Sequence, residues 1–491
     1  MTATLLKNVI VIAHSEMRGI MVGLARKFRE QGSNVTFICS TRQECDFYSS
    51  RFGDAFNRIV TANGFYAEAM KPVRDEAVVV AKAVETEAWL GTNINRLVVY
   101  DRHFGKGFAP GGTRHPRSIM SEYTSYPQML QAYITEIEAC RKLIEDTDPD
   151  LIVGDYRILE AVAGRIGVPI RNLVSSRYKN FFYWSDSMLR TSPAIEAAFS
   201  AMPSKIAPVE MNTPYNAHMD YREKFLRDTS LVGVARRMGY TVTQQIYWIL
   251  RRYEKRIGYF LWDRVAYFWH KRADLIKLRP PVTKSLAEMA GQKFVFFPLH
   301  TEPETALQGM SPEFLFQLEA ITAIARDLPA DVKLVVKEAY HALGRRPRDF
   351  HRQIMAFKNV VMLETMELGL DVVKEAAVTL TITGTAGYEA AVLGKPVISF
   401  GRHNIFGFLD HVHVVQDLGD LRPVLAECLS PSFDHEKARA DGARFLNAML
   451  SISIDLGKFN TLKSDEIAPE TVDEIFAGLQ VSLESGKDKA A

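Results

Sequence analysis

The densest group of residues suited to a charged ligand lies in the segment 381–401, TITGTAGYEAAVLGKPVISFG. An apolar strand is predicted to end in small residues, and a helix starts at once. Gly384, Thr385 and Gly387 let the backbone approach a ligand closely, and the N–H groups of a helix N-terminus attract phosphate. Glu389 is placed where a carboxylate could accept hydrogen bonds from ribose hydroxyls. A tight strand–helix turn, with Glu389 only favouring the helix dipole, is the alternative interpretation.

Two more predicted strands end in polar residues. His300 and Glu304 follow a hydrophobic strand in FPLHTEPE, at the edge of a parallel sheet where ligands bind. Histidine there could contact a phosphate or exchange a proton, although an ordinary polar loop would look the same. Lys337 ends the next strand as a point charge for a phosphate. Two arginines later in that segment could add positive charge, Arg345 and Arg346.

The elements that must position these residues alternate between strand and helix. An apolar run at 8–13, a helical pattern closed by Gly32 and a second run at 34–39 predict a parallel strand pair with a right-handed crossover. The unit recurs at 149–174, so residues 1–175 are predicted to form one open α/β lobe. The same alternation predicts a second doubly wound lobe at 286–434.

Between the lobes, residues 176–285 show no strand signal and interleave aromatic with basic side chains. Long helices are predicted, with two open interpretations. One is peripheral attachment to a membrane; the other, slightly preferred, is a helical cap whose aromatic residues form its core. Residues 435–491 are predicted to be helical and could pack back across the first lobe, with a disordered end at 484–491.

Composition narrows the class of protein. The 491 residues include 60 Lys plus Arg against 58 Asp plus Glu, which gives no case for nucleic-acid binding. The four cysteines lack CxxC spacing, which disfavours a zinc or redox site and suits reduced thiols in the cytosol. The sequence contains neither a signal-peptide pattern nor an apolar run of about 18 residues. A cytoplasmic protein is therefore expected.

Three motifs in order, FPLHTEPE, VKE…GRRP and TITGTAGYEAAVLGKPVISFG, resemble bacterial capsule and surface-polysaccharide biosynthesis proteins related to the capsule Kdo transferases. The resemblance is strong over 294–401 and weaker over 100–107 and 149–177. It implies a GT-B fold, that is, two Rossmann-like lobes, here with a helical insertion and C-terminal helices. It also implies a glycosyltransferase that moves a sugar from a CMP-, UDP- or GDP-linked donor to a surface or capsular polysaccharide or a glycolipid, with no permanently bound cofactor.

The resemblance places the nucleotide sugar in the second lobe, at five matching positions: His300, Glu304, Lys337, Thr385 and Glu389. One departure is clear. The family pattern has His-Pro directly after Lys-Glu, and that His contacts the nucleotide phosphate. Here Ala339 and Tyr340 follow, and His341 stands two positions further on. Either His341 substitutes through a shifted loop, or the donor differs, or activity has been lost.

The resemblance places the acceptor in the first lobe. Asp101 or Glu122 could be the general base that takes a proton from an acceptor hydroxyl, and His14, just after the first strand, is a further candidate. Asp101 could instead form a structural ion pair with Arg102. No DxD pattern suggests a metal site, so helix N-terminus, Lys and His are expected to meet the leaving-group charge without a metal.

Two alternatives to a glycosyltransferase remain open. One is a polyol-phosphate transferase or a UDP-sugar epimerase on the same fold. The other is a non-catalytic nucleotide-sugar-binding component of a polysaccharide assembly complex, which the departure at Ala339 keeps open. The protein is expected to contact its nucleotide sugar and acceptor at the cytoplasmic face of the inner membrane, with such a complex as a further partner.

Overall fold

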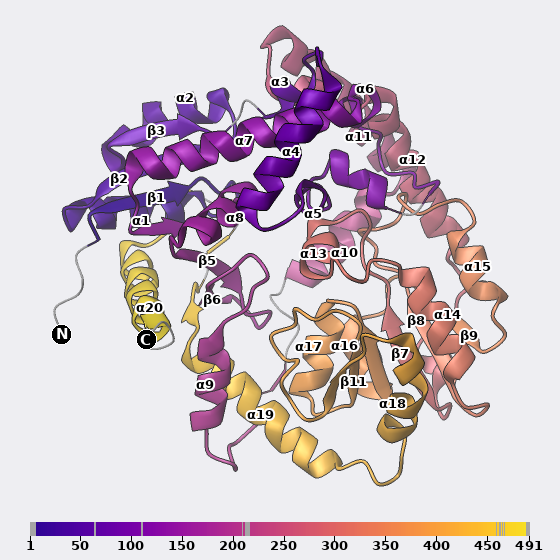
Figure 1. The fold of residues 1–491 in the computed structure, drawn as a ribbon. Helices are drawn as coiled ribbons and strands as arrows, with labels where there is room; N and C mark the ends of the chain where they lie inside the picture. Colours follow the sequence, from indigo (N-terminus) through magenta and orange to yellow (C-terminus); the bar gives the residue numbers. More distant parts are fainter. Residues whose placement is uncertain are drawn as a thin grey trace.

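The computed structural model describes residues 6–62, 65–109, 111–208, 210–211, 217–457, 459–460, 463, 465 and 467–487. The first lobe is built on a seven-stranded sheet in the order β13-β6-β5-β4-β1-β2-β3 (Figure 1). Its strands are β1 (Asn8–Ile12), β2 (Asn34–Cys39), β3 (Arg58–Thr61), β4 (Leu151–Val153), β5 (Ile170–Ser175), β6 (Phe181–Ser185) and β13 (Ile454–Asp455). The first five pair in parallel, whereas β6 and β13 are antiparallel to their neighbours.

Helices cover both faces of this sheet. They are α1 (Arg18–Glu30), α2 (Arg42–Phe52), α3 (Phe65–Ala69), α4 (Glu76–Leu90), α5 (Ile94–Val98), α6 (Ile119–Tyr123), α7 (Tyr126–Thr147) and α8 (Arg157–Ile166), with short 3₁₀ turns η1 (Gly53–Ala55) and η2 (Phe104–Phe108). Strand alternation divides the core. Val9 and Val11 of β1 pack with α1, and Ile10 and Ile12 pack with α4, α7 and α8. A sheet buried on both faces is what the continuous apolar runs predicted.

The second lobe holds a six-stranded parallel sheet in the order β12-β11-β10-β7-β8-β9. Its strands are β7 (Phe294–Pro298), β8 (Lys333–Lys337), β9 (Val360–Leu363), β10 (Val378–Thr381), β11 (Val397–Ser399) and β12 (Val412–Val414). Its helices are α13 (Thr305–Met310), α14 (Gln317–Asp327), α15 (Phe350–Ala356), α16 (Gly369–Glu375), α17 (Thr385–Val392) and α18 (Leu421–Cys428), with 3₁₀ turns η4 (Ala287–Met289) and η5 (Leu418–Asp420). The predicted GT-B layout of two Rossmann-like lobes is confirmed.

The segment between the lobes is helical, but not throughout. It contains α9 (Pro193–Ala201), α10 (Ala217–Asp228), α11 (Leu231–Leu250), η3 (Glu254–Ile257) and α12 (Leu261–Lys277). The prediction that residues 176–285 hold no strand is wrong for β6, whose aromatic residues pair with β5 on one side and β13 on the other. The aromatic residues of α11 and α12 are not simply a core either, since Trp262 is 74% and Tyr240 is 59% exposed.

The C-terminal helices return to the first lobe, as the sequence suggested. Helix α19 (His435–Ser451) leaves the second lobe, and α20 (Pro469–Lys487) packs beside α1, where the rings of Phe28 and Phe476 lie 5.1 Å apart (Figure 1). The disorder expected over 484–491 is wrong for 484–487, because α20 continues to Lys487; residues 488–491 lie outside the described residues. Among the helices described, none is long and apolar enough to span a membrane.

Candidate active site at the carboxyl edges of the two sheets

In the second lobe, the candidate residues meet where the strand order reverses. Strands β7 and β10 are neighbours in the sheet, with β8 beyond one and β11 beyond the other. The connections after β7 and β10 therefore lead to opposite sides, and a crevice is expected between them, because open α/β sheets bind ligands at such a point. His300 follows β7 and Gly384 follows β10, so both predicted ligand residues border this crevice.

The imidazole of His300 is tied to the turn that precedes α17. Its Nε2 accepts a hydrogen bond from the backbone N–H of Thr383 at 3.1 Å and lies 3.3 Å from the hydroxyl of Thr381. Burial and the charge of Arg346 lower the pKa of His300 to about 4, so the ring is neutral at physiological pH. An accepting Nε2 puts the proton on Nδ1. That nitrogen is buried near Gln317 and makes no hydrogen bond of standard geometry with the described residues.

The glycines of the motif have different tasks. At Gly384, which caps α17, a Cβ would lie 3.0 Å from Nε2 of His300 and 2.9 Å from Oγ1 of Thr381, so a larger residue would displace the imidazole. At Gly387, a Cβ would lie 2.5 Å from Cγ2 of Thr381, so this glycine lets the helix pack closely on its own strand. Thr385 is exposed at the first position of α17, beside backbone N–H groups that the helix leaves unpaired.

Lys337 and Glu389 are opposite charges at this crevice, and no hydrogen bond or ion pair to either side chain is found in the part of the chain that the structure describes. Glu389 is only 5% exposed, and burial raises its pKa to about 7 despite the charges of Arg177 and Lys337. Burial also lowers the pKa of Lys337 to about 8. A ligand that supplies partners would stabilise both charged forms.

Arg177 is a site residue that the sequence did not single out. It belongs to the connection between β5 and β6 of the first lobe, yet its guanidinium donates to the carbonyl oxygens of Thr383 and Gly384 at 3.3 and 3.4 Å. Burial lowers its pKa to about 10, and Glu389 is among the charges that it faces. Arg177 thus brings a positive charge from one lobe to the start of α17 in the other.

Arg346, one of the two arginines that could have added charge, belongs to a buried network. Arg346 is buried, and its guanidinium donates to Glu338 at 2.9 and 3.0 Å, to Glu302 at 2.8 Å and to the carbonyl of His300. Burial alone would raise the pKa of Glu338, but Arg346 and a hydrogen bond with His351 lower it to about 2. Arg346 is therefore committed to holding the fold and is not available to a phosphate.

Glu304 and His341 are the remaining second-lobe candidates. Glu304 is exposed at the start of α13, and His341 is exposed with its ring centre 3.9 Å from that of Tyr340. At the position where the family has histidine, the backbone N–H of Ala339 donates to Glu338 at 2.9 Å. The roles predicted for Glu304 and His341 stay predictions.

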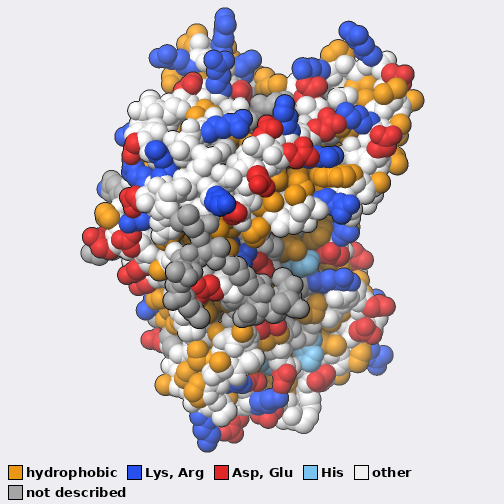
Figure 2. Space-filling model, turned by 60° about the vertical axis from the view of Figure 1, so that its left-hand side comes forward, with side chains coloured by type: hydrophobic (Ala, Val, Ile, Leu, Met, Phe, Trp, Pro, Cys, Tyr) orange, Lys and Arg blue, Asp and Glu red, His pale blue; other side chains and the backbone are white. Residues whose placement is uncertain are grey.

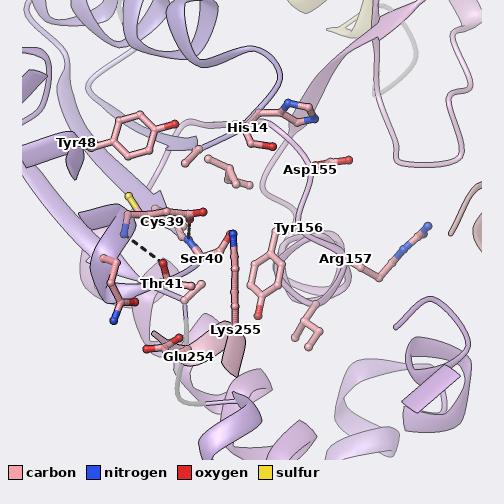
Figure 3. Close-up of a pocket in the computed structure, with 18 of the residues that line it drawn as sticks. His14, Cys39, Ser40, Thr41, Tyr48, Asp155, Tyr156, Arg157, Glu254 and Lys255 are labelled. Atoms are coloured by element: carbon pink, nitrogen blue, oxygen red, sulfur yellow. Dashed lines mark hydrogen bonds between the residues drawn. The ribbon is translucent and has the colours of Figure 1, made fainter. Parts of the chain in front are cut away.

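The first lobe has a cavity of about 590 Å³ at its own strand-order reversal, between β1 and β4 (Figure 3). His14 follows β1, Ser40 and Thr41 follow β2, and Asp155 follows β4. Figure 3 shows Glu254 and Lys255 entering from η3 on the far side from His14. At Gly154, with φ of 112°, a Cβ would lie 2.9 Å from that of Ile12, so glycine allows the two strand ends to meet here.

The three predicted base candidates sit differently around this cavity. His14 and Asp101 line it, whereas Glu122 is exposed on α6 and is not part of the lining. Asp101 Oδ1 accepts from the backbone N–H groups of His103 and Phe104, each at 2.7 Å, so one oxygen caps the η2 turn.

Nδ1 of His14 accepts from the N–H of Glu16 at 3.2 Å, which puts the imidazole proton on Nε2. Asp155, which the sequence did not single out, is exposed at the cavity, and its side chain forms no hydrogen bond or ion pair with the residues that the structure describes. Its position directly after the strand motif LIVG was the available signal.

The lobes touch around a second cavity of about 620 Å³, which is lined by residues of both. At its rim Arg96 pairs with Glu313 at 3.5 Å. Nearby, the backbone N–H of Arg114 donates to the carbonyl of Arg345 at 2.7 Å, and Gln308 donates to the carbonyl of Gly105 at 3.0 Å. These contacts set the two sheet edges facing one another. Within the described chain, no group of three or more His, Cys, Asp or Glu residues could hold a metal ion, and metal independence stays a prediction.

Comparison with known proteins gives no match to a protein-family model and none to a curated protein. Among solved structures, the calicheamicin glycosyltransferase CalG4 is 13% identical over 96% of this chain and 98% of its own, with a TM-score of 0.30. The Kdo transferase KpsC (beta Kdo 2,4 transferase) of Thermosulfurimonas dismutans is 12% identical over 60% and 79%, with a TM-score of 0.30. MnaA of S. aureus with UDP is 11% identical over 98% and 97%, with a TM-score of 0.28. At these values the fold assignment rests on this chain's own sheet order.

Proposed function

We propose that this protein is a GT-B glycosyltransferase that binds a nucleotide sugar in its second lobe and transfers the sugar to an acceptor held in its first lobe. The observation that carries the proposal is the group at the β7–β10 crevice. A neutral His300 with an unpartnered Nδ1–H, the N-terminus of α17, Arg177 and Lys337 all offer donors or positive charge. Such a set is suited to the phosphates of a nucleotide.

Glu389 supports the nucleoside part of the proposal. It lies one turn into α17, is buried and finds no partner among the described residues. A buried carboxylate that lacks a hydrogen bond is costly unless a ligand completes it. The ribose hydroxyls of a nucleotide would supply two donors. In the nucleotide-bound protein, Lys337 and the guanidinium of Arg177 would both be charged and would pair with a phosphate.

For the chemistry, we assign proton removal from the acceptor to Asp155 and not to Asp101 or Glu122. Asp155 is an uncommitted carboxylate at the cavity, whereas Asp101 caps η2 and Glu122 lies outside the lining. With its proton on Nε2, His14 would donate a hydrogen bond that orients the acceptor. Negative charge on the departing nucleotide would be met by His300, Arg177 and the α17 N-terminus, which act without reorganisation because the fold already places them.

The acceptor class proposed is a surface or capsular glycan or a glycolipid, as the sequence resemblance implies. The same phosphate-binding residues would serve a polyol-phosphate transferase, a UDP-sugar epimerase or a non-catalytic binding protein. The reaction that the protein catalyses, and not nucleotide binding alone, therefore separates these alternatives from the proposal. An epimerase would convert a nucleotide sugar without any acceptor. A polyol-phosphate transferase would require a CDP-polyol.

The first test is thermal unfolding of the purified protein with CMP, CDP, UDP, GDP and their sugar conjugates. A ligand present at 100 times its Kd should stabilise the native state by about 2.7 kcal/mol. We expect one nucleotide class to raise the Tm of the wild type and of Glu375→Ala, an exposed carboxylate of α16. The same ligand should leave Glu389→Ala unshifted. No shift with any nucleotide would contradict the proposal. A shift with CMP alone would favour a Kdo- or sialic-acid-type donor.

A further inference from the structure

Helix α11 presents a row of apolar side chains to solvent. Val232, Tyr240 and Leu250 are 80%, 59% and 77% exposed, and Ile246 and Tyr247 lie beside them at about half exposure. Steps of three, four, seven and eight residues put these five side chains on one face of a helix. The opposite face holds the buried residues of α11: Gly233, Val234, Thr241 and Gln245. We call the five exposed residues the α11 stripe.

The charged residues of α11 and of the turn directly after it are arginines. From Thr229 to Tyr253 the sequence has four arginines and neither Asp nor Glu; Asp228, which pairs with Arg237, lies just before this span, and Glu254, Lys255 and Arg256 follow it. Arg236, Arg251 and Arg252 are exposed. Figure 2 shows Lys and Arg side chains gathered at the upper end of the molecule, where Figure 1 places α11 and α12. Apolar and cationic side chains therefore share one surface.

Single exposed apolar residues are common, but a periodic row on one helix face indicates a docking surface. The positive charge around the α11 stripe indicates which kind of partner can bind it. A second copy of the same surface would bring like charges together, which is unfavourable. An anionic bilayer satisfies both features, because aromatic and aliphatic side chains enter the headgroup region while arginines meet lipid phosphates. Since no described helix can span a membrane, α11 would lie on its surface.

We propose that the α11 stripe and its arginines bind the surface of an anionic lipid bilayer. The same helix also reaches the candidate acceptor site. Trp248, next to Tyr247, turns inward and lines a largely apolar cavity of about 700 Å³ with Met120 and Tyr259. Lys255, just beyond the helix, lines both this cavity and the first-lobe cavity of His14 and Asp155. A protein docked through α11 holds the acceptor cavity near the bilayer, where a lipid-linked acceptor resides.

The test is co-sedimentation of the full chain with vesicles of phosphatidylcholine, alone or mixed with phosphatidylglycerol, without nucleotide. We expect at least about tenfold tighter binding to the mixed vesicles, weakened by added salt. Val232→Glu with Leu250→Glu, and separately Arg251→Glu with Arg252→Glu, should each reduce this binding about tenfold or more. Val481→Glu is the matched control, because Val481 is 66% exposed on α20, which lies on the opposite side of the first lobe from α11 (Figure 1).

Each other outcome counts against the proposal. Equal binding to both vesicle types, or binding that Val481→Glu reduces as much as the α11 variants, would overturn it. So would self-association in solution that rises with protein concentration and is lost with Leu250→Glu, since the stripe would then be an interface between two copies. Because nucleotide is absent, failure here leaves the glycosyltransferase proposal untouched, and an absent nucleotide shift leaves this one untouched.

Discussion

Nε2 of His300 accepts the backbone N–H of Thr383 at 3.1 Å, and this bond joins the ends of β7 and β10 across the point where the strand order reverses. The bond uses the lone pair of the imidazole and leaves its Nδ1–H without a partner among the described residues. The ring is therefore part of the turn, and its Nδ1–H is the donor that we propose for a nucleotide. Any change that moves the ring should affect the proposed nucleotide site before it affects the fold as a whole.

Gly384→Ala tests this link. The new Cβ would lie 3.0 Å from Nε2 of His300 and 2.9 Å from Oγ1 of Thr381, so the ring must move. We expect a loss of about 1–3 kcal/mol in the free energy of unfolding, with nucleotide binding weakened about tenfold or more, measured by urea denaturation and calorimetric titration. Gly369→Ala is the control, because Gly369 also lies at the start of a helix and a Cβ there meets nothing within 4 Å. Equal effects of the two variants would contradict the proposed role of His300.

Glu389→Gln should separate binding from stability. Burial raises the pKa of Glu389 to about 7 from its usual 4.5. Between these values the native state holds a proton that the unfolded state releases, so this group lowers stability as pH rises and its full cost applies above pH 7. The amide lacks this titration, so the variant should be more stable than wild type at pH 8, by on the order of 3 kcal/mol, and similar to it at pH 4.

Thermal unfolding at the two pH values checks this, with Glu375→Gln as the exposed control. Nucleotide binding by Glu389→Gln should fall at the same time, because an amide accepts more weakly than a carboxylate from ribose hydroxyls. A Glu389→Gln protein that is no more stable at pH 8 than at pH 4, relative to wild type, would show that the carboxylate already has a partner.

Much of the second-lobe site could be predicted because its signals are local. Strand, turn and helix of the 381–401 segment adjoin in sequence, and His300 and Lys337 follow apolar runs that mark strand ends. Arg177 could not be found this way, since its contact with Thr383 spans 206 residues and depends on how the lobes meet. Nor could the role of Arg346 be predicted, because the sequence does not distinguish a buried arginine paired with Glu302 and Glu338 from an arginine that binds phosphate.

The helical insertion shows the same limit. Its aromatic and basic composition suited either a buried core or a membrane surface, and only the burial of Val234 and Gln245 shows which way α11 is turned. In the first lobe, Asp155 adjoins a strand end as clearly as His14 does, but Asp101 could not be recognised as a cap of η2 before that turn was seen.

Arg346→Met tests the buried network behind the site. Its removal leaves Glu302 buried without a counter-charge and Glu338 with His351 as its remaining partner; breaking a buried pair typically costs about 3–5 kcal/mol. Without Arg346, these carboxyls should protonate more readily, so the loss should be smaller at pH 5 than at pH 8. Urea denaturation at both values measures it. Arg348→Met, at an exposed position two residues away, should change stability by less than about 0.5 kcal/mol; a similar loss in both would refute the buried-pair explanation.

Asp155→Asn tests the proposed base once a donor and an acceptor are known. Asparagine keeps the size of the side chain but cannot take the acceptor proton, so kcat should fall about 10²–10⁴-fold while donor binding, measured by calorimetry, stays within about twofold of wild type. His14→Gln should mainly raise the KM for the acceptor, because it removes an orienting donor. Asp46→Asn, an exposed carboxylate of α2 outside the cavity lining, is the matched control and should be unaffected. If Asp101→Asn abolished turnover while Asp155→Asn did not, the base would be Asp101, and its contacts with His103 and Phe104 would serve to orient it.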